Sequence, residues 1–528
     1  ERMTSALAGC VVGQSRAIRE PTASRVRADR GRRRAAAARP HPATATRRRR
    51  MSTTRLDAVT GGPALTDDEA TALRHEAISY AAQHGLLVAT ESSESGATMP
   101  STFTHAPIAL LPTPFPADVF ALATRVAPLF ASVSDAVSRD DAFLRETLAG
   151  VIRADDFTRR VWDIYERCGG QEGRHPMELG VLRTDYMLDA PSGLPLQVEV
   201  NTVSTSFMAL STRVSQMHRR AIEWLGAERA YAEGAGSDAG SASAEDVASA
   251  LARRLPTNSA LELAAETLHA GWRAMNDDDA RVLMVVQPCE RNVFDQRMIE
   301  AALWERHGVK TIRATLREIA SDAVVAEDDA KTLTYRGARV SVVYYRAGYA
   351  PTDYPSEAEW DARLLLERSG AVKSPSAAMH LAGTKKVQQT LASPGGLERF
   401  VECEEDVRAM RSVFAGLYAL DGEDAVAAVE LGLNAPESYV LKPQREGGGN
   451  NLYGEALRAQ LAKFTPDAPI GSDGDLSSFI LMQRILPPVN RTLCLRNGEM
   501  QELETLSELG IYGGDLRVGG GGYFGGPP

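Results

Sequence analysis

Cysteine is scarce in this sequence. Its five cysteines are an odd number and lie far apart (Cys10, Cys168, Cys289, Cys403 and Cys494), which suggests free thiols in a reducing compartment and not a disulfide framework. The nine histidines show no zinc-ligand spacing with one another or with cysteine, so zinc chemistry has no support. No run approaches the roughly 18 uncharged apolar residues that a membrane span needs. The length predicts about two to three domains.

Acidic residues are almost absent from residues 1–50, which hold fourteen arginines and three acidic residues. Such a segment is predicted to stay unfolded on its own. Its composition is typical of an organelle transit peptide; the alternatives are translated sequence upstream of a start at Met51 and an arginine-rich arm for nucleic acid. The rest of the chain carries more than the whole net charge of −10, which does not favour nucleic acid as a partner.

Glycines are grouped directly after one predicted strand. Ser438–Leu441 is a short apolar stretch, and Lys442, Glu446 and three glycines follow it. Glycines let backbone N–H groups approach anionic oxygens, a lysine adds positive charge, and a carboxylate can hold Mg²⁺. The lysine precedes the glycines, so this is not a Walker A motif. The pattern predicts a nucleotide phosphate loop, with a mobile surface loop as the alternative.

A second group of oxygen ligands lies on a predicted β-hairpin. Strands at 181–188 and 196–201 flank a Pro-Ser-Gly turn. Alternation along the second strand directs Gln197, Glu199 and Asn201 to one face. The carboxylate of Glu199 and the amide of Asn201 suit a hard cation such as Mg²⁺; the alternative is the solvated face of a half-buried strand.

Helical periodicity and then strand–helix alternation predict a mixed α/β protein. Apolar residues recur at helical spacing over 66–87 and 116–165. Strands at 282–286, 309–312 and 340–345, with a helix at 294–307, predict a small, mostly parallel sheet covered by helices. Glu290–Asn292 and Arg346–Tyr349 follow two of these strands, where ligands gather in such sheets, although either group could form an ordinary surface turn.

Four long motifs in order resemble eukaryotic-type glutathione synthetase, a family of ATP-grasp ligases. They span Glu290–Gln296, Leu381–Gln389, Lys442–Gly454 and Ser507–Ile511. The resemblance runs from about Thr66 to Gly513.

The resemblance implies an ATP-grasp fold with an inserted Rossmann-like substrate domain and a helical N-terminal portion. The expected parts are a disordered leader at 1–50, the N-terminal part of the catalytic region with the Mg²⁺ ligands at 51–279, the Rossmann-like domain at 280–385 and the nucleotide-binding region at 386–513. Residues 514–528 form a Gly-rich tail where the family has its C-terminal lid. A truncated or misread gene end would explain that tail, and a chain of this kind would lack part of its active site.

The resemblance also implies the reaction. ATP converts the cysteinyl carboxylate of γ-glutamylcysteine to an acyl phosphate, which glycine attacks to give glutathione, ADP and phosphate. The alternatives are a related ligase that accepts β-alanine or serine, and a truncated, non-catalytic ATP-binding protein. A homodimer is expected without nucleic-acid or membrane partners. The expected location is the cytoplasm, or a plastid or mitochondrion if residues 1–50 are a transit peptide.

The site residues carried over from the family fall into four groups. Arg183 is expected beside the reacting carboxylate, and Mg²⁺ is expected on Glu199, Asn201 and Glu446. The expected ATP contacts are Asn201, Lys385, Lys442, Gln444, Glu446, Gly447, Gly448, Gly449, Asn450, Asn451, Tyr453, Met482, Gln483, Arg484, Ile485 and Glu508. The expected γ-glutamylcysteine contacts are Arg183, Ser204, Thr205, Ser206, Glu290, Arg291, Asn292, Gln296, Arg346, Ala347, Gly348 and Tyr349. Ala347 and Gln483 replace a frequent Asp and a frequent Glu of the family.

Overall fold

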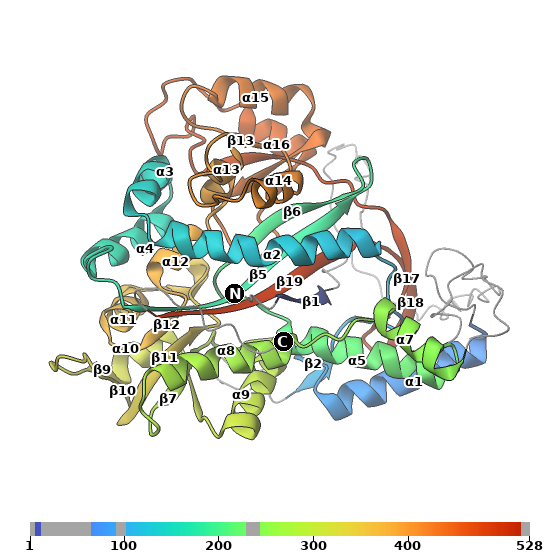
Figure 1. Ribbon diagram of the computed structural model, residues 1–528. Helices are drawn as coiled ribbons and strands as arrows, with labels where there is room; N and C mark the ends of the chain where they lie inside the picture. The colour runs from blue at the N-terminus through green and yellow to red at the C-terminus, as the bar shows by residue number, and fades with distance from the viewer. Residues whose placement is uncertain (1–5, 12–64, 91–101, 229–242, 519–528) are drawn as a thin grey trace, which may run out of the picture.

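The computed structural model describes residues 6–11, 65–90, 102–228 and 243–518. Within these ranges the strands form five sheets, with helices packed between and around them (Figure 1). Three of the sheets meet around the residues that the sequence predicts as the site.

The longest strands form a central antiparallel sheet with the order β1-β19-β5-β6. β5 (Met177–Asp189) and β6 (Leu194–Asn201) are the predicted hairpin. β19 (Glu508–Val518) pairs along β5, and β1 (Ala6–Val11) pairs along the other edge of β19. Helix α2 (Ala117–Ser138) lies lengthwise across this sheet (Figure 1).

The structure differs from the sequence predictions at both chain ends. The N-terminal segment predicted to stay unfolded includes β1, an apolar stretch that precedes most of the arginines and finds backbone partners on the edge of β19. The tail predicted to start at Gly514 instead continues β19 to Val518, and Leu516 is buried in the core. Residues 12–50 and 519–528 lie outside the described residues, so the leader and the Gly-rich tail stay predictions there.

The second sheet confirms the predicted, mostly parallel α/β unit. Its order is β8-β7-β11-β10-β9, with β12 beside β11, and β7, β8, β11 and β12 run parallel. Residues alternate between two buried faces: Val282 and Met284 pack towards α8 and α9, whereas Leu283 and Val285 pack towards α10 and α11. The elements are α8 (Ala260–Ala274), β7 (Arg281–Val285), α9 (Val293–His307), β8 (Thr311–Ala314), α10 (Leu316–Asp322), β9 (Ala323–Val325), β10 (Leu333–Tyr335), β11 (Ala338–Tyr345), α11 (Glu357–Arg368) and β12 (Val372–Ser374).

The third sheet lies in the lobe at the top of Figure 1 and carries the glycine-rich loop. Its antiparallel order is β13-β16-β14-β15. The loop connects β14 to β15, and α15 and α16 pack against the sheet through a leucine-rich cluster. The elements are β13 (Leu417–Ala419), α15 (Ala425–Asn434), β14 (Tyr439–Pro443), β15 (Leu452–Tyr453), α16 (Gly454–Leu461) and β16 (Phe479–Gln483).

Two smaller sheets and three helices complete the side of the molecule opposite that lobe. β18 (Glu499–Thr505), β17 (Asn490–Arg496) and β4 (Ile108–Ala109) form one sheet, and β2 (Leu87–Ala89) and β3 (Phe103–His105) form the other. The helices beside them are α1 (Asp67–His84), α5 (Met208–Trp224) and α7 (Ala244–Arg254).

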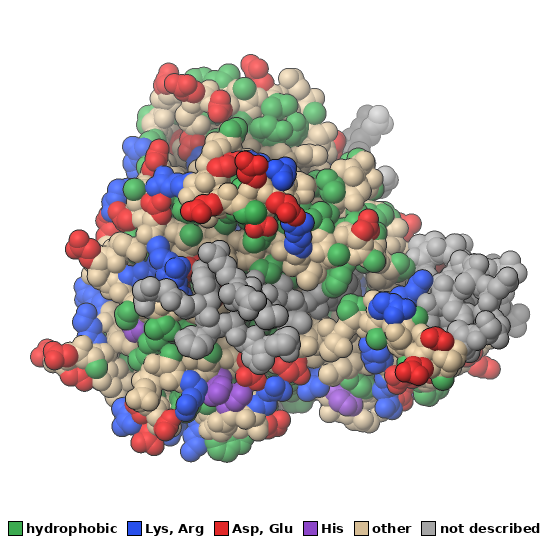
Figure 2. Space-filling view, viewed as in Figure 1, with side chains coloured by type: hydrophobic (Ala, Val, Ile, Leu, Met, Phe, Trp, Pro, Cys, Tyr) green, Lys and Arg blue, Asp and Glu red, His purple; other side chains and the backbone are tan. Residues whose placement is uncertain are grey.

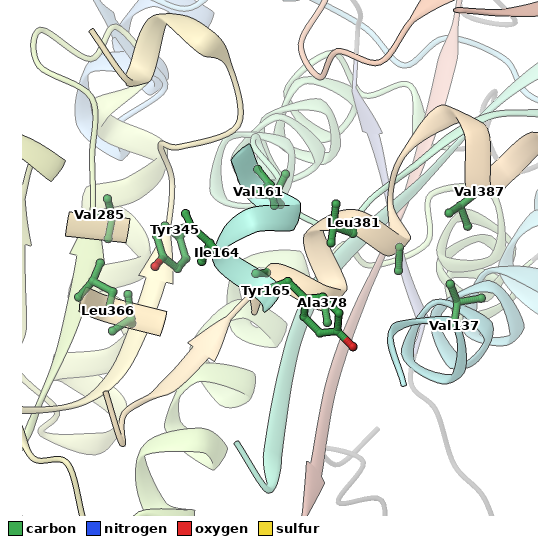
Figure 3. Packing of buried hydrophobic residues seen from close by; sticks show 14 of the residues in the cluster. Val137, Val161, Ile164, Tyr165, Val285, Tyr345, Leu366, Ala378, Leu381 and Val387 are labelled. Atoms are coloured by element: carbon green, nitrogen blue, oxygen red, sulfur yellow. The ribbon is translucent and has the colours of Figure 1, made fainter. Parts of the chain in front are cut away.

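A continuous hydrophobic core joins the helical N-terminal part to the parallel sheet (Figure 3). Val161 and Ile164 of α4 (Asp156–Arg167) pack with Leu381 of α12 (Ala377–Ala382) and with Tyr345 of β11. Burying each such side chain contributes about 1.5–3 kcal/mol. This core therefore fixes the position of α13 (Lys385–Ala392), which follows α12 directly. Two other helices, α3 (Asp141–Ala154) and α14 (Glu404–Ser412), contribute buried residues to the same core.

Helix α2 is long and apolar enough, by length and composition, to cross a membrane. Ten of its residues are nevertheless buried, and the helix packs against β19, β5 and β6. Its apolar face is thus part of the protein core. On the described part of the face in Figure 2, Lys and Arg side chains are interspersed with Asp and Glu and do not gather into one basic surface.

Candidate active site

Two glutamates and two lysines from three separate elements meet at one point. Lys385 Nζ lies 2.8 Å from Glu446 Oε1 and 3.2 Å from Glu199 Oε2. Lys442 Nζ lies 3.7 Å from the same Glu199 oxygen. Glu199 comes from β6, Lys385 begins α13, and Lys442 and Glu446 come from β14 and its loop. The structure therefore brings together carboxylates that are far apart in the sequence.

Local irregularities in the chain produce this convergence. A β-bulge at Val198 interrupts the β5–β6 register, since Asp185 lies opposite Glu199 but Tyr186 lies opposite Gln197. The bulge leaves the carbonyl oxygen of Val198 to accept a hydrogen bond from Lys442 Nζ at 2.8 Å. The alternation predicted along β6 is thus interrupted between Gln197 and Glu199.

The corner between α12 and α13 requires glycine. A Cβ atom at Gly383 would lie 2.2 Å from Thr202 Oγ1 at the end of the hairpin. This close approach brings the first residue of α13, Lys385, to the hairpin and its carboxylates. The short loop predicted at 381–389 is confirmed as the break between α12 and α13.

Burial and charge act in opposite directions in this cluster. Burial disfavours ionisation of Glu199, but Lys385, Lys442 and Arg183 outweigh it and lower the Glu199 pKa to about 2. Burial lowers the pKa of Lys442 and raises the pKa of Glu446. Burial, with the nearby charges of Asp185 and Glu199, raises the Glu508 pKa to about 8. Additional positive charge near these carboxylates would therefore stabilise their ionised forms.

The oxygen ligands fit a hard divalent cation. Glu446 Oε2 is buried and has no hydrogen-bond partner, so one carboxylate oxygen is left to coordinate. The amide nitrogen of Asn201 donates a hydrogen bond to Asp185 Oδ2 at 2.8 Å. The amide oxygen of Asn201 therefore faces away from Asp185. With Glu199, these residues supply the oxygen donors that Mg²⁺ prefers.

Arg183 is held by the carboxylate of Asp185, which is not one of the predicted site residues. Its Nε and Nη2 donate to the two oxygens of Asp185 at 2.6 and 2.7 Å, and its Nη1 donates to the carbonyl oxygen of Ser206 at 3.2 Å. Asp185 is 1% exposed. The register pairs Arg183 with Asn201 across the hairpin, so these two predicted residues are neighbours.

The predicted peptide-binding residues form two linked groups beside the parallel sheet. Arg346 Nη2 donates to Asp295 Oδ2 at 2.9 Å and to Ser206 Oγ at 3.2 Å. Asp295 also accepts the backbone N–H groups of Phe207, Ala209 and Leu210 at the start of α5. The second group joins Gln296 Nε2 to Glu290 Oε2 at 3.0 Å. Nε and Nη1 of Arg346 are buried and have no hydrogen-bond partner, so they remain available as donors.

The glycine-rich loop and the 346–349 loop approach each other. A Cβ at Gly447, whose φ is +82°, would lie 3.5 Å from Tyr349 Cε2. Asp353 Oδ2 accepts the backbone N–H groups of Gly348 and Tyr349 at 2.8 and 3.1 Å and so fixes the second loop. The predicted phosphate loop therefore lies next to a predicted substrate loop.

The remaining predicted residues hold various positions. Tyr453 and Met482 lie opposite Val440 on either side of β14, and Arg484, Ile485 and Gln483 lie at the end of β16. The side chains of Met482, Ala347 and Thr205 are buried. Ser204 Oγ donates to the Tyr345 carbonyl oxygen at 3.3 Å, and Asn450 Nδ2 donates to the Gly447 carbonyl oxygen at 3.1 Å. Five further predicted residues lie in loops: Arg291, Asn292, Gln444, Gly449 and Asn451. A Cβ atom at Gly448 would meet no other atom within 4 Å.

Asp185, Asp295 and Asp353 were not among the site residues predicted from the sequence. Each orients a predicted site residue from within the structure. Asp185 stands two residues after Arg183 on one strand, so strand alternation could have signalled a shared face. The other two bind partners that only the folded chain brings near.

Two other features lie away from this cluster. A cavity of about 1380 Å³ is bordered by Arg174, His175, Lys373 and neighbours, none of which is a predicted site residue. Glu266, His269 and His307 have ligand atoms within 4.8 Å of one another. The two imidazole rings stack almost parallel, however, and Arg306 pairs with Glu266. This is the geometry of a hydrogen-bonded contact between α8 and α9, because a shared ion must lie in the plane of both rings.

Buried lysines facing paired carboxylates beside a glycine-rich loop meet the needs of an enzyme that holds a triphosphate with its cation. In this mixed α/β architecture they define an ATP-dependent ligase of the ATP-grasp class.

Comparison with known proteins gives the family. The family described as "Eukaryotic glutathione synthase, ATP binding domain" matches residues 67–522. The chloroplastic glutathione synthetase of Solanum lycopersicum is 43% identical over 446 residues, covering 84% of this chain and 77% of that protein. The glutathione synthetase of Homo sapiens is 37% identical over 451 residues, covering 84% and 88%. The chain belongs to the eukaryotic glutathione synthetase family.

A solved structure agrees on the fold. A glutathione synthetase-like effector from Globodera pallida, in its apo form, superimposes with a TM-score of 0.63 at 21% identity, covering 86% of this chain and 90% of that one.

Proposed function

We propose that this protein ligates γ-glutamylcysteine to glycine with ATP, giving glutathione, ADP and phosphate. The observation that carries the proposal is the meeting of Glu199 and Glu446 at Lys385 Nζ. A peptide carboxylate does not acylate an amine at neutral pH, so it must first be activated by phosphoryl transfer. In such a transfer the protein mainly positions the reactants and neutralises their negative charge.

Each residue of the cluster has a role in that step. Lys385 and Lys442 bind phosphate oxygens of ATP with fixed positive charge. Glu199, Asn201 and Glu446 would hold Mg²⁺, which would neutralise charge on the phosphates. The backbone of Gly447–Gly449 offers N–H groups to the same oxygens. These residues orient the terminal phosphate towards the peptide.

Arg183 binds the cysteinyl carboxylate that becomes the acyl phosphate. Its charge orients this carboxylate and offsets the negative charge that gathers as the phosphoryl group arrives. Arg346, Ser206 and Tyr349, with the 290–296 segment, bind the remainder of the peptide. The other predicted ATP contacts, from Tyr453 and from the end of β16, surround the adenine and ribose.

We also propose a homodimer, which the family resemblance supports. For the location, we propose the cytoplasm, with plastid import through residues 1–50 as the alternative, since the tomato relative is named chloroplastic. Sedimentation of the purified chain tests the dimer. Imaging of fluorescent fusions with and without residues 1–50 tests the location.

Phosphate release from ATP tests the reaction. The assay contains the full chain, Mg²⁺ and γ-glutamylcysteine, with and without glycine, and parallel arms replace glycine by β-alanine or serine. The expected result is strong stimulation by glycine with formation of glutathione. Turnover that no amino acid stimulates would contradict a ligase, and stimulation by β-alanine or serine alone would reassign the acceptor.

A further inference from the structure

The guanidinium of Arg183 is paired on one edge only. A guanidinium has two edges that can each meet a carboxylate with two parallel hydrogen bonds. Asp185 occupies the Nε–Nη2 edge, at 2.6 and 2.7 Å. Ser206 takes one N–H of Nη1 through its carbonyl oxygen. The Nη1–Nη2 edge therefore keeps one N–H on each nitrogen for a second carboxylate.

The same aspartate also sets the orientation of Asn201. An amide can present either its nitrogen or its oxygen to a neighbour, and the neighbour's chemistry selects one. A carboxylate only accepts, so Asp185 Oδ2 draws the amide nitrogen of Asn201 to 2.8 Å. The Asn201 oxygen then faces away from Asp185, as a cation ligand requires.

A glycine on β19 lies directly beside the Arg183–Asp185 pair. Gly510 lies directly opposite Asp185 in the sheet. A Cβ at Gly510 would lie 2.8 Å from Arg183 Cδ and 3.2 Å from Asp185 Oδ1. By contrast, a Cβ at Gly513 on the same strand would come no nearer than 4.0 Å to Ala131 Cβ. The structure thus leaves space on β19 where the Arg183–Asp185 pair lies.

We propose that Asp185 is a positioning residue for both halves of the active site. One carboxylate directs the free edge of Arg183 to the reacting carboxylate of the peptide and directs the oxygen of Asn201 to the cation. This inference rests on the proposed function, because it uses the roles given there to Arg183 and Asn201. Gly510 contributes to the same arrangement, since its lack of a side chain lets Arg183 lie flat against the sheet.

Asp185→Asn tests the proposal in the full chain. The introduced amide lacks the charge that pairs with Arg183 and has a single accepting oxygen. It can no longer accept from Arg183 Nε on one side and from Arg183 Nη2 and Asn201 on the other, so the contact that orients Asn201 is weakened. We expect kcat to fall about 10- to 100-fold. We also expect the Mg²⁺ concentration for half-maximal ATP binding, measured by titration calorimetry, to rise several-fold. The KM for ATP at saturating Mg²⁺ stays within about twofold of the wild-type value, because the phosphate-binding lysines are intact.

The double variant Asp185→Asn with Asn201→Asp separates the two roles. The carboxylate at position 201 accepts from the introduced amide and still offers an oxygen to the cation. The Mg²⁺ requirement should therefore return towards the wild-type value, while kcat stays low because Arg183 lacks its anionic partner. A merely structural role for Asp185 would give no such split. An Asp185→Asn variant with wild-type kcat and Mg²⁺ requirement would overturn the proposal.

Two glycine variants keep the proposal testable if Asp185→Asn does not fold. Gly510→Ala displaces Arg183 and should lower kcat about tenfold or more, whereas Gly513→Ala should match the wild type. Equal activities of the two glycine variants would overturn the proposal. The Mg²⁺-dependent ATP titration needs no glycine-dependent turnover. If the wild-type chain shows no such turnover, the proposed function fails, and the titration still decides the role of Asp185 towards Asn201.

Discussion

A substitution of Glu446 gives the most direct test of the proposed Mg²⁺ site. Its side chain is 15% exposed, one oxygen meets Lys385 and the other has no partner. Glu446→Gln removes the charge and keeps the shape. We expect turnover to fall about 100-fold or more, because a divalent cation contributes several kcal/mol to charge stabilisation. Phosphate release at saturating Mg²⁺ measures this loss.

The matched control is Glu455→Gln on α16, whose side chain is 90% exposed and whose contact with Arg458 is 4.0 Å long. It should leave turnover unchanged. Both variants should unfold at nearly the wild-type urea concentration, because Glu199 still pairs with Lys385 in Glu446→Gln. Near-full turnover in Glu446→Gln would remove Glu446 from the metal site.

We expect Arg183 to act on a different step from the lysines. Arg183→Ala should lower kcat/KM for γ-glutamylcysteine about 10²- to 10³-fold, as for loss of a donor to developing negative charge. The affinity for ATP should change much less, because the lysines proposed to bind its phosphates, Lys385 and Lys442, are unchanged in this variant. Steady-state kinetics combined with nucleotide titration separate the two quantities. A variant that only binds ATP more weakly would contradict the role at the carboxylate.

At the scale of elements, the glycine-rich loop is tied to a helix start. Asp155 Oδ2 caps α4 by accepting the Thr158 N–H at 2.8 Å, and Arg445 Nη2 pairs with Asp155 Oδ1 at 2.6 Å. Arg445→Met should raise the KM for ATP several-fold, because the loop loses its anchor, and should lower stability by less than about 1 kcal/mol. Asp155→Ala should also lower stability, by about 1–2 kcal/mol, because the helix loses its cap.

Urea unfolding and ATP kinetics on both variants check this division. A larger loss of stability in Arg445→Met than in Asp155→Ala would contradict it. The two variants also separate the effect on the loop from the effect on the helix, since Asp155 contacts both and Arg445 contacts Asp155 from the loop.

Elements could be predicted from the sequence where local pattern decides them. The hairpin, the parallel sheet and the strand before Lys442 follow from strand periodicity and turn residues, and the structure confirms them. The bulge at Val198 could not be predicted from local pattern. It is accompanied by contacts to Gln388 and Lys442, which come from other elements. The pairing of Asp295 with Arg346 and with the start of α5 likewise depends on contacts far along the chain.

The proposed metal and phosphate residues were predicted for a different reason. Glu199, Lys385 and Glu446 lie in motifs whose resemblance to a family implies their roles, and strand alternation or glycine content supplied only a weak signal for each. Asp185 lies outside those motifs. Its proposed role depends on contacts that only the folded chain makes: the hairpin register brings Asp185 opposite Glu199, and Asn201 donates a hydrogen bond to it.

At the scale of the whole molecule, three sheets and the core around α12 enclose the site. The central sheet supplies Arg183, Glu199, Asn201 and Glu508, and the parallel sheet supplies Arg346. The upper sheet supplies Lys442, and the core helices supply Lys385. Stability of the whole fold and geometry of the site are therefore linked through the residues buried between these units. His380 is one of them, since it lies in α12 near Lys385 and packs against Phe157.

Burial of His380 makes the fold sensitive to acid. Burial, with the charges of Arg363 and Lys385, lowers its pKa from 6.5 to about 3. The unfolded chain therefore binds this proton more tightly than the folded chain, so the stability contribution is complete above pH 6.5 and is lost as the pH falls towards 3. His380 alone should contribute a loss of about 2 kcal/mol between pH 7.5 and pH 5. His380→Phe should reduce this pH dependence, and His75→Phe, at an exposed position on α1, should retain it. Free energies of unfolding in urea at the two pH values measure the difference, and an unchanged slope in His380→Phe would show that another group is responsible.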